Sequence, residues 1–324
     1  MSDAATDWRW MGAALALASR GAGLCFPNPS VGCVIVKDGR VIGRGHTGAG
    51  GRPHAEALAL AQAGEAARGA TAYVTLEPCA HVSPRGPACA DSLIAAGVAR
   101  VVVAAHDPDP RTDGDGVARL RSAGIAVTPG VRANEAEAGL SGFLTRLRHG
   151  RPHITLKLAV SLDGAIARAD GTSKWITGDR ARAAAHLERA RHELIIVGRG
   201  TWDADAPTLD VRLPGLESRS PRIGVVGRGD GLPAHVSHFA DLAALIADPA
   251  LHVLVEGGMG LAASLLEADL VDAIILMRAP ILIGGGRTLG NIGLADLAQA
   301  HGRWAAGPAM TLGPDRIERF IRTR

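Results

Sequence analysis

Four residues in the amino-terminal half of the chain have the types and spacing of a hydrolytic zinc centre. His54 and Glu56 are one residue apart, Cys79 follows a proline, and Cys89 comes after nine further residues. One imidazole and two thiolates make three protein ligands, which leaves the fourth tetrahedral position to water, as in catalytic zinc sites. The metal lowers the pKa of that water, and a carboxylate at position 56 can carry its proton without being a ligand.

Each of these residues has a more ordinary explanation when taken alone. A lone histidine or cysteine usually packs in the core, and His-Ala-Glu recurs by chance. Cys25 and Cys33 are predicted to be small buried residues of this kind. The joint occurrence of the four residues at strand-to-helix junctions nevertheless predicts a catalytic zinc, and the H-x-E and P-C pattern is the signature of zinc-dependent deaminases.

The spacing of the two cysteines indicates the kind of substrate. Nucleic-acid and nucleoside deaminases typically place two residues between them, whereas nine intervene here and offer extra contacts to a bulky or charged substrate. The chain has one Tyr, four Phe and a formal net charge of +3. Neither a stacking platform nor a long basic groove is indicated, so we expect a small-molecule substrate and no nucleic-acid partner.

The length of 324 residues predicts two domains. The amino-terminus has no signal-peptide layout, and no apolar run reaches the length of a membrane span. With four cysteines, the chain is expected to be cytoplasmic, with reduced thiols and no membrane partner.

Helical and strand patterns alternate along both halves, which is typical of α/β domains. In the first half the patterns predict helices over 8–20, 54–63, 88–96, 117–123 and 134–148, and strands over 31–36, 41–45, 72–75, 101–105 and 125–128. Asp38-Gly39 is a strong hairpin turn signal between the first two strands. The pattern breaks at 149–152, which predicts domains over 1–148 and 149–324.

The second half repeats the alternation with different motifs. It predicts strands over 154–158, 193–197, 222–226, 252–256 and 273–277, helices over 179–191, 239–247 and 260–267, and a turn-rich stretch over 201–221. The glycine-rich segment 255–260 lies between a strand and a helix, where backbone N–H groups can approach a phosphate. Tight turns need glycine equally often, and no good G-x-G-x-x-G fingerprint is present.

The first half resembles the deaminase half of the RibD family of bifunctional riboflavin biosynthesis enzymes. The resemblance runs from Trp10 to Leu147 and is carried by segments 27–33, 51–56, 75–79 and 93–97. It implies a zinc-dependent deamination of 2,5-diamino-6-(5-phosphoribosylamino)pyrimidin-4-one, with oxygen replacing the 2-amino group. In this comparison Asn28 would hold the pyrimidine edge, and His81 and Arg85 would face the polar parts of the substrate.

These three assignments have alternatives. Asn28 lies between two prolines and could be a turn residue, and His81 and Arg85 could be solvated loop residues. The family commonly has His-His-Gly-Arg/Lys-Thr-Pro-Pro-Cys at this loop, and segment 81–89 of this chain is one residue longer.

The second half resembles the reductase half of the same family, through segments 155–159, 161–164, 175–178, 197–201 and 255–260. It implies that NADPH reduces the ribosyl group of 5-amino-6-(5-phosphoribosylamino)uracil to ribityl, and that the chain forms a homo-oligomer. The implied NADPH site consists of Ala159, Trp175, Thr201, Asp205, Gly258, Met259, Gly260, Leu261, Ala262 and Ala263. The implied substrate site consists of Ser173, Arg189, Leu209, Arg212 and Glu256.

Several of these side chains have a chemical reason to be there. Arg189 and Arg212 suit a 5′-phosphate because a guanidinium binds it with two donors, although both could lie on a solvated face. Lys157 and Asp163 could orient the sugar or form structural ion pairs. The family's Asp-Asp-Pro is Asp-Ala-Pro at 205–207 here, which predicts altered cofactor affinity or preference.

The fold predicted for the whole chain is two three-layer α/β domains, the first like cytidine deaminase and the second like dihydrofolate reductase. Three other functions remain open. One is a zinc deaminase for another base or nucleotide with a degenerate or altered reductase domain. The others are a nucleic-acid base deaminase with an accessory domain and a non-catalytic module.

Overall fold

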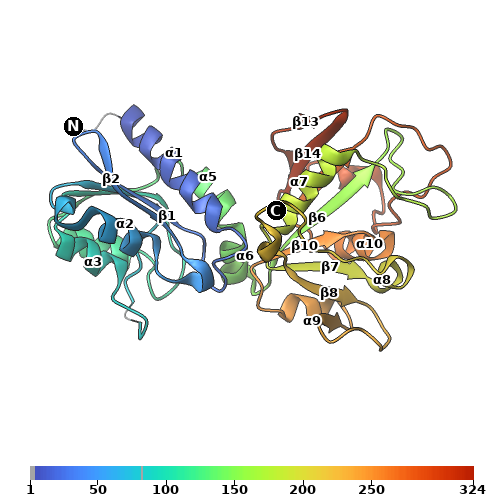
Figure 1. The fold of residues 1–324 in the computed structure, drawn as a ribbon, viewed down its shortest axis with the longest axis horizontal. Coiled ribbons are helices and arrows are strands. Elements are labelled where there is room, and N and C mark those ends of the chain that lie inside the picture. Colours follow the sequence, from blue (N-terminus) through green and yellow to red (C-terminus); the bar gives the residue numbers. More distant parts are fainter. Residues whose placement is uncertain (1–3, 82) are drawn as a thin grey trace. The chain divides into compact units, whose positions relative to one another are not determined.

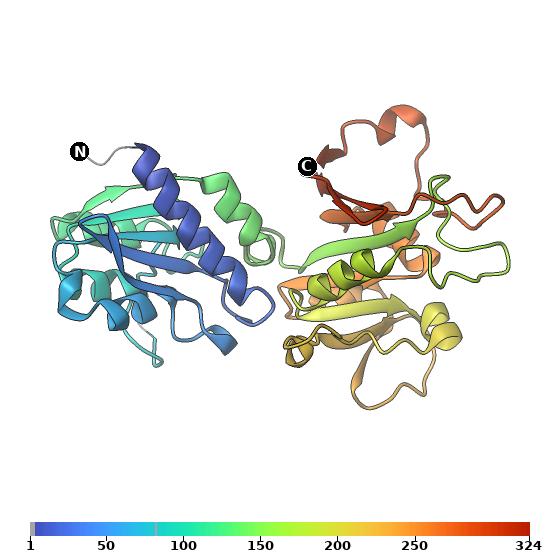
Figure 2. The same cartoon turned by 45° about the horizontal axis from the view of Figure 1, so that its top comes forward.

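The computed structural model describes residues 4–81 and 83–324, which divide into two compact units at residue 150. Figures 1 and 2 show both units, and each is described here by itself. Within the described residues, no helix combines the length and the apolar character needed to cross a membrane.

The first unit is a mixed sheet between two layers of helices. The sheet order is β2-β1-β3-β4-β5, with β1 antiparallel to both neighbours and β3, β4 and β5 parallel. α1 and α5 contact each other and the sheet, and α2, α3 and α4 form a second contacting group (Figure 1). The elements are α1 (Ala4–Gly21), β1 (Gly32–Lys37), β2 (Arg40–His46), η1 (Ala49–Gly51), α2 (Ala55–Ala63), η2 (Gly64–Ala67), β3 (Thr71–Leu76), α3 (Cys89–Ala96), β4 (Arg100–Ala105), α4 (Asp115–Ser122), β5 (Ala126–Thr128), α5 (Ala133–Gly139) and α6 (Ser141–His149).

Local sequence explains the main features of this unit. Asp38 and Gly39 both have positive φ, as a tight hairpin turn between β1 and β2 requires. Nearly every residue of β1, β3 and β4 is buried, and most are small or β-branched, because helices cover both faces of the sheet. The single helix predicted over 134–148 is wrong: Leu140 leaves the helical conformation and buries its side chain, which separates α5 from α6.

The second unit is a larger mixed sheet, also covered on both faces. Its order is β12-β14-β11-β6-β10-β7-β8-β9, with β13 paired to β14. The strands from β11 to β9 run parallel, and β14 is antiparallel to its partners. The elements are β6 (His153–Val160), α7 (Asp179–Arg189), β7 (Leu194–Gly198), α8 (Arg199–Asp205), η3 (Glu217–Arg219), β8 (Arg222–Val226), β9 (Val236–Phe239), α9 (Leu242–Ala247), β10 (His252–Glu256), α10 (Met259–Glu267), β11 (Ala273–Arg278), η4 (Leu297–Ala300), β12 (Trp304–Ala306), β13 (Met310–Leu312) and β14 (Asp315–Arg322).

Alternation along the central strands sends successive side chains to two different cores. Ile196 packs with α9 and α10, whereas Ile195 and Val197 pack with Leu209 on the other face. α7 covers β11 and β14 through its alanines. The predicted three-layer organisation is therefore confirmed in both units.

The structure corrects two boundaries in the second unit and adds strands near its end. The stretch 201–221 is not all turn, because α8 extends to Asp205. The predicted helix 239–247 begins only at Leu242, where the Asp241 carboxylate accepts the N–H of Ala244, and Phe239 belongs to β9. The antiparallel strands after residue 300 were not predicted from the sequence.

Candidate active sites

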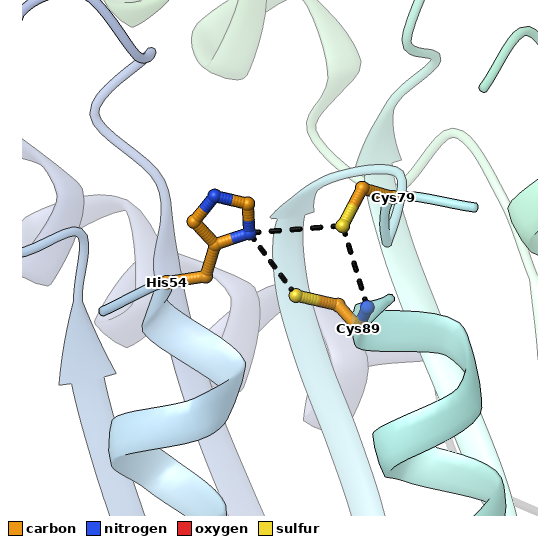
Figure 3. A group of neighbouring side chains, drawn as sticks. All are labelled: His54, Cys79 and Cys89. Carbon is orange, nitrogen blue, oxygen red and sulfur yellow. Dashed lines mark hydrogen bonds between the residues drawn. The ribbon is translucent and has the colours of Figure 1, made fainter. Parts of the chain in front are cut away.

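The three expected zinc ligands converge from three junctions of the first unit. His54 immediately precedes α2, Cys79 lies in the loop after β3, and Cys89 is the first residue of α3. His54 Nδ1 lies 3.2 Å from Cys89 Sγ and 3.7 Å from Cys79 Sγ (Figure 3). The three ligand atoms all lie within 4.8 Å of one another, and no other such group of three occurs within the described residues. This donor set and spacing fit a tetrahedral zinc with one open position.

Glycines in β2 allow α2 to hold His54 at this place. A Cβ at Gly43 would collide with the carbonyl oxygen of Ala59, and one at Gly45 would approach that of Ala55 within 2.6 Å. The strand and the helix can pack this closely only because both positions lack a side chain. The backbone that carries His54 and Glu56 is thereby fixed against the sheet.

The two sulfurs do not have the same chemical environment. The hydrogen bond from Cys89 lowers the pKa of the Cys79 thiol to about 4, and the same contact raises the pKa of Cys89. Cys79 also accepts the backbone N–H of Cys89 at 3.3 Å, which stabilises a thiolate. Cys79 is therefore the sulfur that is already charged near neutral pH and able to bind a cation.

Glu56 lies in the first turn of α2 and is only 3% exposed. Burial is the largest influence on its carboxyl group and raises its pKa. A carboxyl group whose pKa moves toward neutrality is better suited to take and return protons. The predicted proton carrier thus lies beside the ligands without being one of them.

A cavity of about 260 Å³ opens beside this cluster. Asn28, His54, Glu56 and Cys79 line it, as the sequence predicted, while Cys89 lies behind them. Asn28 Nδ2 donates to the carbonyl of Gly51 at 2.9 Å and lies 3.2 Å from His54 Nε2. The Asn28 amide thus links Gly51 and His54 at the cavity wall, and its contact with the pyrimidine stays a prediction.

Other residues of the cavity had no assigned role in the sequence analysis. Arg52, Asp107, Asp109 and Arg111 line it together with the expected His81 and Arg85. Burial raises the pKa of Asp107 to about 6, whereas the hydrogen bond from Arg111 lowers the pKa of Asp109. Arg52 directly precedes Pro53 and His54, and its position in that segment is the one signal that could have drawn attention to it.

The loop that carries Asp107 and Asp109 is anchored by Glu77. This buried carboxylate accepts the backbone N–H of Asp107, Gly114 and Val117 at 3.5, 3.3 and 3.1 Å. His106 Nδ1 lies 3.0 Å from it. Glu77 therefore acts as a structural anchor and leaves Cys79, two residues later, free to face His54.

The second unit contains a larger cavity, of about 1430 Å³. It lies where β6, β7, β8 and β10 reach their carboxyl ends, which is where open α/β sheets bind ligands. The predicted residues that line it are Ala159, Ser173, Trp175, Arg189, Thr201, Asp205, Leu209, Arg212, Glu256, Gly258, Met259, Gly260 and Leu261. Ala262 and Ala263 do not: Ala262 faces the core under α10, and Ala263 points toward Gly290.

The glycine-rich segment has the geometry that a nucleotide requires. Gly257 and Gly258 have positive φ, and a Cβ at either would approach the side chain of Thr201 within 3.1 and 2.9 Å. α10 begins at the next residue, so its free backbone N–H groups face the cavity end of the sheet. The cradle and the volume both fit a nicotinamide dinucleotide.

The cavity floor is a buried ionic group centred on Glu256. Arg189 donates to both oxygens of its carboxylate, at 2.7 and 2.9 Å, and Lys157 Nζ lies 3.9 Å away. Burial raises the pKa of Glu256, but Lys157 and Arg189 outweigh burial and lower it overall. The guanidinium fork that the sequence assigned to a phosphate is therefore already engaged, and the exposed Arg212 is the freer of the two arginines.

Lys157 and Asp163 do not pair with each other. Asp163 accepts the backbone N–H of Ile283 and Gly284 at 3.2 and 2.9 Å and fixes that turn outside the cavity. These bonds and the one from Ser161 lower its pKa to about 2. Of the two candidates for orienting the sugar, only Lys157 lines the cavity.

Comparisons with known proteins cover nearly the whole chain. The family described as the cytidine and deoxycytidylate deaminase zinc-binding region matches residues 4–105, and the RibD C-terminal domain matches residues 152–301. The riboflavin biosynthesis protein RibD of Escherichia coli K12 is 42% identical over 91% of this chain and 94% of its own length. That of Aquifex aeolicus is 37% identical, covering 91% of this chain and 92% of the relative.

Two solved structures have the same arrangement over the full length. Acinetobacter baumannii RibD, form 1, has a TM-score of 0.90 and 37% identity, covering 99% of this chain and 100% of that one. A Thermotoga maritima protein described as a diaminohydroxyphosphoribosylaminopyrimidine deaminase/5-amino-6-(5-phosphoribosylamino)uracil reductase has a TM-score of 0.88 and 30% identity, covering 99% of each chain.

Proposed function

The chain belongs to the RibD family of riboflavin biosynthesis enzymes, and from that premise we propose what each cavity does. The first unit hydrolyses the 2-amino group of 2,5-diamino-6-(5-phosphoribosylamino)pyrimidin-4-one. The second reduces the ribosyl group of the product, 5-amino-6-(5-phosphoribosylamino)uracil, to ribityl. Zinc serves the first step and NADPH the second.

In the deamination, His54, Cys79 and Cys89 hold the metal and Glu56 moves the proton. A zinc ion bound by these ligands supplies a Lewis acid that makes a water acidic near neutral pH. Glu56 takes one proton from the water and gives it to the ring nitrogen, and it then takes the second proton from the added oxygen and gives it to the departing amino group. Oxygen from water thus replaces nitrogen on the ring, and ammonia leaves.

In the reduction, the chain positions two molecules against each other. Bound NADPH would supply a hydride to C1 of the ribosyl unit, while the bond from C1 to the ring oxygen opens and that oxygen takes a proton. Thr201 and the segment from Gly258 to Leu261 hold the dinucleotide, and Trp175, which is 65% exposed, offers a surface for a ring. Lys157, aligned by Glu256, faces the sugar. Arg212 is exposed, and its Nε lies 3.6 Å from Asp210, so its remaining N–H groups can bind the phosphate.

The observation that carries this proposal is the convergence of three zinc ligands on a cavity that also contains a buried glutamate. The test is to incubate the protein with zinc, NADPH and the diaminopyrimidine and to follow products by mass spectrometry. We expect replacement of NH by oxygen first and then the addition of two hydrogens. Conversion of a different aminated base, with no conversion of this one, would contradict the assignment.

We also propose that the chain works as a homo-oligomer in the cytoplasm. The family resemblance supports the oligomer, and the four free cysteines support a reducing compartment. Sedimentation of the purified protein would test the oligomeric state.

A further inference from the structure

Two buried side-chain nitrogens of residues that line the deaminase cavity have no hydrogen-bond partner within the described residues; one is an N–H donor, and the other is a ring nitrogen that donates in one of its two tautomers. They are Nε of Arg52 and Nδ1 of His81. Buried polar groups are almost always paired, because leaving one unpaired costs free energy. A pair of unsatisfied groups that both face the same cavity indicates that a ligand completes them.

Arg52 differs in this respect from Arg111 in the same cavity. The guanidinium of Arg111 is bound to both oxygens of Asp109, with Nε at 2.9 and 3.1 Å. No carboxylate pairs with Arg52 in the described part of the chain, although Arg52 carries a full positive charge. Its Nη1 lies close to Gly86, 3.8 Å from where a Cβ would stand, so the guanidinium rests against the long loop between the two cysteines.

The acidic groups of the same cavity bind a different part of a ligand. Glu56 and Asp107 offer oxygens to the amino groups of a pyrimidine, whereas Arg52 and His81 offer N–H groups to an acceptor. The strongest acceptor on the proposed substrate is its 5-phosphate, and guanidinium is the side chain best matched to phosphate. Because Glu56 and Asp107 would repel a phosphate, the phosphate belongs at the end of the cavity that holds the arginine.

We propose that Arg52, assisted by His81, binds the phosphate of the deaminase substrate and makes this cavity selective for the phosphorylated form. The inference rests on the proposed function. Arg52 acts on substrate affinity and takes no part in proton transfer. The additional loop residue before Cys89 provides the surface against which its guanidinium is held.

The test compares Arg52→Gln with the native protein on the phosphorylated substrate and on the same compound after removal of its phosphate. For the phosphorylated substrate we expect KM to rise roughly 10- to 100-fold, as for loss of a charge-assisted hydrogen bond, with kcat little changed. For the dephosphorylated compound KM should be the same in both proteins. Arg52→Lys should recover part of the affinity, and Arg44→Gln, an exposed arginine on β2, should change nothing.

Inorganic phosphate gives a second, independent measurement. It should inhibit the native enzyme competitively and bind the zinc-loaded protein in calorimetry, and both effects should be lost in Arg52→Gln. An equal rise of KM for both compounds, or no rise for either, would overturn the role of Arg52. If the native protein deaminates neither compound, the proposed function fails, and equal phosphate binding by native and Arg52→Gln proteins would then overturn this inference separately.

Discussion

Both units bury a glutamate in the wall of their cavity, and the two carboxyl groups are held in opposite ways. Burial raises the pKa of Glu56, which has no cation paired with it among the described residues. The pKa of Glu256 is lowered despite burial, because Lys157 and Arg189 surround it with positive charge. One glutamate is therefore prepared to exchange a proton, and the other is prepared to remain an anion that aligns two cations.

The comparison shows how the same side chain serves two kinds of chemistry. Hydrolytic deamination needs a group that changes its protonation state twice, and no arginine or lysine is paired with Glu56 among the described residues. Hydride transfer needs fixed positions, so the site in the second unit locks its glutamate in a bidentate pair. The same substitution, glutamate to glutamine, should thus have opposite consequences in the two units.

The largest effect is expected for Glu56→Gln. The amide cannot carry the proton, so kcat for deamination should fall by about 10²- to 10⁴-fold. Stability should not fall, because the change removes a carboxyl group that burial already disfavours in its charged form. Product analysis by mass spectrometry measures the rate, and metal analysis should find zinc still bound. A variant that kept more than about a tenth of the activity would show that another group moves the proton.

Glu256→Gln should instead destabilise the second unit. Without the carboxylate, Arg189 and Lys157 are left buried and uncompensated, a loss of about 3–5 kcal/mol when one partner of a buried pair is removed. Denaturant unfolding measures the change, and deamination by the first unit should persist. Glu267→Gln, an exposed glutamate on α10, is the matched control. Equal unfolding free energies for the variant and the control would show that the Glu256 carboxylate does not stabilise the second unit, which would contradict the proposed difference between Glu56 and Glu256.

Glu77 offers an intermediate case, a buried glutamate that holds a loop. Glu77→Gln removes the charge that binds His106 and weakens three backbone hydrogen bonds, which should cost about 1–3 kcal/mol. Because Asp107 and Asp109 lie on that loop, KM for the deaminase substrate should rise together with the loss of stability. A change in the free energy of unfolding below about 0.5 kcal/mol, the range of ordinary surface substitutions, would mean that the loop keeps its conformation without the Glu77 carboxylate.

The two sites also differ in how much of them the sequence could predict. The zinc ligands are recognisable because the chemistry needs particular side chains, and His54, Glu56, Cys79 and Cys89 lie within one short segment. The family and the two-domain α/β fold were predicted correctly for the same reason. Ion pairs between residues far apart in the sequence were not predictable. Arg189 and Glu256, for example, are 67 positions apart and pair only in the folded chain.

Antiparallel strands after residue 300 escaped prediction for a related reason. β12 and β13 are three residues long, and β14 mixes charged and apolar residues without a regular alternation. Short strands of this kind are defined by their neighbours more than by their own composition. Arg52 likewise had only its position beside Pro53 and His54 as a signal in the sequence, because the missing partner of its Nε is visible only in the folded chain.

Near pH 6 the smallest effect on stability is expected from a histidine, because the loss there has only begun, and histidines have different roles in the two units. His54 is a ligand, whereas His153 lies in the second unit next to His252, which in turn contacts His192. Burial lowers the pKa of His153 to about 3, opposed by Asp272 and reinforced by His252, His192 and Arg151. The folded protein therefore keeps this imidazole neutral at pH values where the unfolded chain, with an ordinary histidine pKa near 6.5, takes up a proton.

It follows that the stability of the second unit should fall as the pH drops below about 6.5, by up to about 1.4 kcal/mol per pH unit for His153. The loss should continue toward pH 3 and be absent above neutrality, since the unfolded state binds the additional proton only in that window. His153→Gln should reduce this slope, and His301→Gln, which is exposed, should not. Denaturant unfolding at several pH values, with hydrogen exchange followed in β6, measures the difference. Parallel curves for His153→Gln and the native protein would show that the buried histidines do not couple this unit to pH.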